Sequence, residues 1–227
     1  MTRTVDLIAA FELEINKLDN SLQKPVTDDS LFWINQAIVK FVKDRFNGNP
    51  PKRTSYEQNE KRTRDLNRLY EELTYETPEA ESHPSYDSYE YTYPSDMMFV
   101  LNEDVVIDGP DGPMNTFVFE CTADSFMHRV NNSLTDFHYK LKRARPLRVR
   151  TNKGFRLLTD KNYTIYSYTL GYLRVPEEIT DQDPYKEHED FEDYIWLEIT
   201  KIAAQMYVEN QSDPRYKTLT NEVLTQE

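Results

Sequence analysis

The hydrophobic pattern of this chain changes period twice, and this change limits the folds that the chain can adopt. Towards both ends, apolar residues recur at spacings of three and four, which is typical of amphipathic helices. The middle instead holds short apolar runs separated by turn residues, which is typical of strands. Helices at the two ends with strands between them predict a fold of the α+β class.

The spacings predict four helices, over residues 4–20, 28–47, 55–73 and 186–210. The second helix ends where Gly and Pro follow Asn47, since these residues favour a helix terminus. The third is strongly charged and has apolar residues mostly in its second half. The last has the clearest apolar stripe, and a shorter helical segment is expected after it.

Between the third and fourth helices, residues 97–175 are predicted to form about six strands, as a small sandwich or barrel. The segment 75–95 before them is rich in Glu and Tyr, contains prolines and shows no helical period. It is predicted to be a long loop, either ordered at an interface or mobile at the surface.

These segments predict two domains. The terminal helices pack as a bundle formed by residues 1–74 with 180–227. A β-rich insertion of residues 75–179 lies between helices three and four.

The composition narrows the range of functions. A net charge of −13 argues against tight wrapping by nucleic acid. The 16 Tyr and 11 Phe argue against general disorder, and they suit either sheets or interfaces. No signal peptide or membrane-spanning stretch is visible, so a soluble protein without a membrane partner is expected.

The sequence marks no catalytic, cofactor or metal site. Cys121 is the single cysteine, so an internal disulfide and a thiolate zinc site are both excluded. Phosphate-binding glycine loops and metal-ligand spacings are absent. A thiol enzyme that uses Cys121 with His128 or His138 is one alternative, and a small buried Cys121 is the simpler interpretation.

Charges of opposite sign gather in two separate segments. Residues 137–159 contain eight cations and no carboxylate, whereas residues 177–193 contain nine carboxylates and one lysine. Three interpretations stay open: contact with DNA, contact between neighbouring copies in a head-to-tail ring, or a match within one chain. For the contact between copies, the expected residues are Arg143, Arg145, Arg148 and Arg150 against Glu187, Glu189 and Asp190.

The last part of the chain resembles a known family. After the final predicted strand come Tyr172-Leu173-Arg174 and Pro176, then an acidic helix start, then Asp213-Pro214-Arg215-Tyr216-Lys217-Thr218. This order resembles the ring, or head–tail connector, proteins in the neck of crAss-like, short-tailed bacteriophages of gut Bacteroidales. The resemblance covers residues 165–227 best and is looser over 4–47.

The resemblance implies a structural virion protein with no enzymatic activity and no cofactor. Such proteins form dodecameric rings below the portal protein, contact the tail or a second ring protein, and extend the channel through which DNA passes without specific binding. They are assembled in the host cytoplasm and reside in the virion. The alternative within the same class is another virion module, such as a tail hub or a capsid-associated protein.

Overall fold

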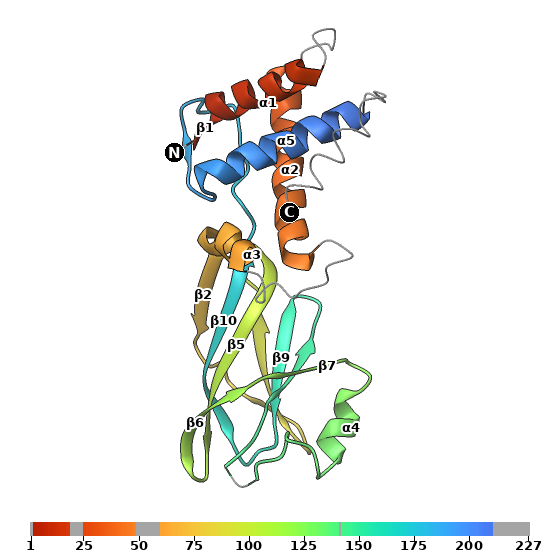
Figure 1. Cartoon of the computed structure of the whole chain (residues 1–227). Helices are drawn as coiled ribbons and strands as arrows, with labels where there is room; N and C mark the ends of the chain where they lie inside the picture. Colours follow the sequence, from red (N-terminus) through yellow and green to blue (C-terminus); the bar gives the residue numbers. More distant parts are fainter. Residues whose placement is uncertain (1, 19–24, 49–59, 141, 211–227) are drawn as a thin grey trace. The chain divides into compact units, whose positions relative to one another are not determined.

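The computed structural model describes residues 2–18, 25–48, 60–140 and 142–210, and within them it is a mixed α+β protein with five α-helices and three sheets. The chain divides into two compact units, shown in Figure 1. The helical unit combines Met1–Leu69 with Val175–Glu227. The β unit is Tyr70–Arg174.

Three long helices build the helical unit: α1 (Thr4–Leu18), α2 (Thr27–Asn47) and α5 (Asp193–Asn210). Each contacts the other two, and Figure 1 shows α5 crossing α2. Apolar side chains of the three helices are buried, and this burial stabilises the unit. The largest buried side chains of this core are those of Leu7, Phe11, Ile15, Ile34, Phe41, Phe191 and Trp196.

The last helix begins later than predicted, because backbone pairing takes the residues before it. Strand β11 (Glu187–His188) pairs antiparallel with β1 (Thr2–Arg3) in a two-stranded sheet. Glu187 therefore lies on an extended strand, and α5 begins at Asp193. The helical segment predicted after α5 lies outside the described residues.

The third helix, predicted over 55–73, is wrong over residues 70–73, and its residues 55–59 lie outside the described part. The described part comprises α3 (Glu60–Leu66), the 3-10 helix η2 (Asn67–Leu69) and strand β2 (Tyr70–Tyr75). Leu66 and Leu69 are buried in the helical unit, but Leu73 pairs with Leu170 in a sheet. Leucines at helical spacing thus belong to two different elements. Pairing with strand β10 (Thr164–Arg174), far along the chain, makes residues 70–75 a strand.

Two sheets form the β unit. The first has the order β2-β10-β5-β6 and the second β3-β4-β9-β8-β7. Neighbours are antiparallel except β7 and β8, which are parallel. The bounds are β3 (Glu81–Ser82), β4 (Asp87–Thr92), β5 (Met97–Gly109), β6 (Gly112–Phe117), β7 (Phe119–Cys121), β8 (Leu147–Arg150), β9 (Gly154–Thr159) and β10 (Thr164–Arg174).

The tyrosine-rich segment 75–95 is not a long loop. It supplies the end of β2, all of β3 and all of β4. Tyr89 and Tyr91 point into the core and are 3% and 4% exposed. The ring of Tyr91 stacks on that of Phe155 with centroids 5.3 Å apart. Alternate tyrosines in this segment therefore form a strand whose period of two was concealed by the carboxylates between them.

The second sheet is covered on both faces. Phe155 and Leu157 of β9 pack between the two sheets. Leu158, next to them, points to the opposite face, where it meets α4 (Phe126–Asn131) and the segment that follows α4. Figure 1 shows α4 beside β7. This outer layer positions the surface described next; its core residues are Cys121, Val130, Phe137, Leu147, Val149 and Leu158.

Candidate interaction surface

The arginines of the basic segment that lie on strands form ion pairs with carboxylates of the β unit itself. Arg148 on β8 is 4% exposed and forms ion pairs with Glu103 at 2.8 Å and Glu120 at 3.0 Å. Glu103 also accepts a hydrogen bond of 2.5 Å from Tyr168. Burial opposes the charge on Arg148, yet the attraction of Glu103 leaves its pKa above the ordinary value. Arg150 is exposed and pairs with Glu120 at 2.8 Å.

The cations on the turn between α4 and β8 are different. Lys140 and Arg143 exchange backbone hydrogen bonds of 2.9 and 2.8 Å, which closes a tight turn. Lys142 occupies the left-handed region with φ of 60° and projects outward. Within the described chain, neither Lys142 nor Arg143 forms an ion pair, and Arg145 lies 3.9 Å from the exposed Asp136. We call Lys140, Lys142, Arg143 and Arg145 the basic turn.

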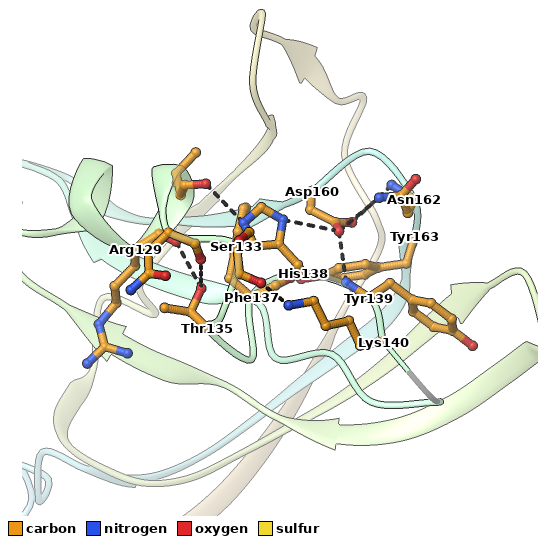
Figure 2. Close-up of polar contacts among 12 residues, drawn as sticks. Arg129, Ser133, Thr135, Phe137, His138, Tyr139, Lys140, Asp160, Asn162 and Tyr163 are labelled. Atoms are coloured by element: carbon orange, nitrogen blue, oxygen red, sulfur yellow. Dashed lines mark hydrogen bonds and ion pairs between the residues drawn. The ribbon is translucent and has the colours of Figure 1, made fainter.

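A buried carboxylate anchors the base of this turn (Figure 2). Asp160 accepts hydrogen bonds from the Tyr139 backbone N–H at 2.8 Å and from the Asn162 backbone N–H at 3.0 Å. His138 sits with Nδ1 3.6 Å from Asp160 and with Nε2 3.0 Å from the Val130 carbonyl oxygen. The backbone under the turn is therefore fixed by side chains of the strand-end loop after β9, and the cations stand on a rigid base.

A second set of contacts holds the preceding loop. Tyr163 donates to the Phe137 carbonyl oxygen at 3.0 Å, and burial raises the pKa of Tyr163 well above its ordinary value. Thr135 donates to the carbonyl oxygens of Arg129 and Asn132, both at 2.9 Å, as Figure 2 shows for the first. Residues 132–139 have no regular secondary structure, and these bonds satisfy the carbonyl oxygens of Asn132 and Phe137 within them.

Shallow hollows adjoin the basic turn. One of about 420 Å³ is lined by Leu134, Thr135, Asp136, His138, Lys140 and Arg143. Another of about 240 Å³ lies towards β6 and is lined by Phe117, Lys142, Arg143 and Arg145 among others. Their rims carry two strongly exposed apolar side chains, Leu134 at 85% and Phe117 at 67%. Cations beside exposed apolar groups are typical of a surface that binds a partner.

The acidic segment belongs to the helical unit. Asp190 is 8% exposed and accepts a hydrogen bond of 2.7 Å from the Glu177 backbone N–H, so it holds the segment together from within. Lys186 pairs with Glu177. Glu187 and Glu189 are exposed, and Tyr185 between the carboxylates is 69% exposed.

The structure sorts the residues expected at a contact between copies into two groups. Arg148 and Asp190 are buried and engaged within their own units. Arg143, Arg145, Arg150, Glu187 and Glu189 are exposed. The sequence pattern did not single out Leu134 or Phe117. Leu134 could have been noticed as an isolated leucine in a polar loop.

The candidate nucleophile Cys121 makes no contact with a histidine among the described residues. Cys121 is buried, and its Sγ lies 3.2 Å from the Ser125 hydroxyl. His128 is exposed, and both ring nitrogens of His138 face other groups. Across the described ranges, no group of three or more His, Cys, Asp or Glu side chains is arranged to hold a metal ion, and no helix is long and apolar enough to cross a membrane.

We expect one buried histidine to make the stability of the helical unit depend on pH. His188 is 5% exposed, and its Nε2 lies 3.0 Å from the Thr4 hydroxyl. Burial lowers the pKa of His188, as does the charge of Lys186, while Glu177 and Asp190 oppose the shift. In the unfolded chain the histidine titrates near its ordinary pKa of about 6.5. The unfolded state therefore takes up a proton that the folded state resists, and stability falls as pH drops below about 6.5.

We expect the melting temperature to fall between pH 7.5 and pH 5.5, and His188→Asn to reduce that fall. His128→Asn, at an exposed histidine, is the matched control and should leave the fall unchanged. Thermal unfolding followed by circular dichroism measures both. An equal pH dependence in all three proteins would contradict the assignment to His188.

Comparison with models of known protein families gave no match for this chain. A search of curated proteins likewise found no match.

Proposed function

We propose that the chain is a non-catalytic structural subunit that packs against copies of itself. Its charge distribution carries the proposal. The chain has a net charge of −13, yet it keeps exposed cations together on the basic turn and exposed carboxylates together in another unit. Two different, complementary surfaces on one chain suit a head-to-tail contact, which closes into a ring when the rotation between copies allows it.

The neck ring of a short-tailed bacteriophage is the assembly that we propose. The likeness of residues 165–227 to ring proteins of crAss-like phages supports it. In this proposal the helical unit is a bundle, the β unit is inserted between its third and fourth helices, and twelve copies form the ring. The ring would join the portal protein to the tail or to a second ring protein and extend the DNA channel within the virion.

The net negative charge of the chain suits a protein that lines a DNA channel. Carboxylates repel phosphates, and a wall that repels phosphate lets DNA slide without specific binding. Salt screens exposed charges over about 10 Å at 0.1 M, so contacts between exposed ions in such a ring would weaken as salt rises.

Light scattering of the purified protein, alone and mixed with a candidate portal protein, tests the proposal. We expect a species of several times 27.0 kDa, either alone or on the portal, that becomes smaller between low and moderate salt. The reason is that its contacts include exposed ion pairs, which salt screens. A protein that stays monomeric under every one of these conditions would refute the proposal.

A further inference from the structure

The basic turn is a part of the basic segment whose cations are exposed to a partner. On the strands, Arg148 and Arg150 are bound to Glu103 and Glu120. On the turn, Lys142 and Arg143 are exposed and have no carboxylate partner among the described residues. Charges held close together repel each other unless counter-charges approach, so the turn favours an acidic partner.

The exposed apolar side chains beside the basic turn indicate what kind of acidic partner would bind there. Leu134 and Phe117 stand 85% and 67% exposed beside the cations. Sugar and phosphate groups would leave these side chains in water, whereas a peptide with an aromatic residue among carboxylates would cover them.

This chain contains such a peptide. Residues 181–189 expose the carboxylates of Asp181, Asp183, Glu187 and Glu189, with Tyr185 at 69% exposure between them. The Asp183 side chain accepts a hydrogen bond of 3.0 Å from the Tyr185 backbone N–H, and the pairing of β11 with β1 holds the end of the segment. The peptide is thus presented in an ordered form, which lowers the entropy cost of binding.

We propose that the basic turn of one copy binds residues 181–189 of a second copy. In this contact, Tyr185 of the second copy covers Leu134 and Phe117, and Glu187 and Glu189 of the second copy approach Lys142 and Arg143. The inference rests on the proposed self-packing and names the two surfaces that perform it. Compared with the contact expected from the sequence, the proposed one omits Arg148 and Asp190, because both are bound within their own units, and adds Lys142 and Tyr185.

Charge reversal on each surface tests the contact. K142E/R143E changes the net charge from −13 to −17, and E187K/E189K changes it from −13 to −9. Each pair should weaken self-association at least tenfold, about the loss expected when attraction at two exposed positions becomes repulsion. The combined four-residue variant returns the net charge to −13 and should recover most of the association, since the reversed surfaces again attract each other.

Mixing the two single-surface variants separates a contact between copies from a contact within one chain. Each variant keeps one intact surface, and the reversed surfaces of the two variants also attract each other, so the mixture should form species of two or more chains that neither variant forms to the same extent alone. Analytical ultracentrifugation at low salt resolves these masses. If the mixture contains only single chains, the contact between copies is refuted.

The control for net charge is R64E/K153E, which also gives −17 but places the changes on α3 and on the β8–β9 turn, outside both the basic turn and residues 181–189. It should associate like the unaltered protein. If it weakens as K142E/R143E does, general repulsion and not this contact is responsible.

The outcomes separate the two proposals. If the unaltered protein assembles and the K142E/R143E variant assembles equally well, this contact is overturned and the proposed function stands. An unaltered protein that never associates would overturn both. If K142E/R143E associates normally but loses retention of a short DNA duplex, the turn binds phosphate and the proposed contact is wrong.

Discussion

Gly154→Ala is expected to destabilise the β unit by about 3 kcal/mol, near the upper end for an overpacked site. A Cβ at this position would lie 1.9 Å from the Tyr91 carbonyl oxygen and 2.9 Å from the Thr92 Cα. Both obstacles are backbone atoms of β4, the strand that pairs with β9 through Thr92 and Gly154. The methyl group fits only if the two strands separate, which breaks their hydrogen bonds and disturbs the stacking of Tyr91 on Phe155.

Chemical denaturation followed by far-ultraviolet circular dichroism measures this loss. Gly112→Ala is the control, because a Cβ there meets nothing within 4 Å but the backbone has φ of +94°. It should lose only about 1 kcal/mol, from backbone strain alone. Equal losses in the two variants would show that β4 moves aside at little cost, so that its close approach does not explain the requirement for glycine at 154.

Arg45→Met is expected to cost the helical unit about 3–5 kcal/mol, the range for breaking a buried ion pair by removing one partner. The Arg45 guanidinium bonds to Asp65 at 3.0 Å and also contacts Glu198. It packs over the Phe41 ring at 4.7 Å. The Asp65 side chain is 1% exposed, so loss of the arginine would leave a buried carboxylate that keeps the hydrogen bond from the Tyr194 hydroxyl at 2.9 Å but has lost its positive partner.

Tryptophan fluorescence measures this loss selectively, because Trp33 and Trp196 are the only tryptophans and both belong to the helical unit. Adding Asp65→Leu to Arg45→Met removes the stranded carboxylate and should recover a substantial part of the stability. If the double variant is less stable than the single variant, the loss comes from missing packing and not from an unpaired charge.

The sequence predicted the long helices well because their evidence is local. Ile34, Phe41 and the stripe of α5 repeat at helical spacing over several turns, and each face needs one apolar partner surface. The mixed α+β class followed from the same reasoning. Prediction failed where distant strands decide the outcome. Leu73 fits a helix by spacing, but Leu170, far along the chain, draws it into a sheet.

The candidate surface was predictable only in part. Composition separated a basic from an acidic segment, which located the turn at Lys140–Arg143. It could not show that Arg148 faces the space between two sheets, because Glu103 and Glu120 meet it only after the sandwich forms. Nor could it show that Tyr89 and Tyr91 fill a core, since that depends on the pairing of β4 with β9.

The parallel pairing of β7 and β8 has a consequence for how this surface could diversify. Two parallel neighbours cannot be joined by a tight turn, so residues 122–146 form a crossover whose two ends are fixed side by side in one sheet. Closing a loop depends only weakly on its length, with each doubling costing about 0.6 kcal/mol. Insertions or deletions at the tip of the crossover would therefore alter what the protein binds at little expense to the sandwich, which makes this segment a natural place for related chains to differ.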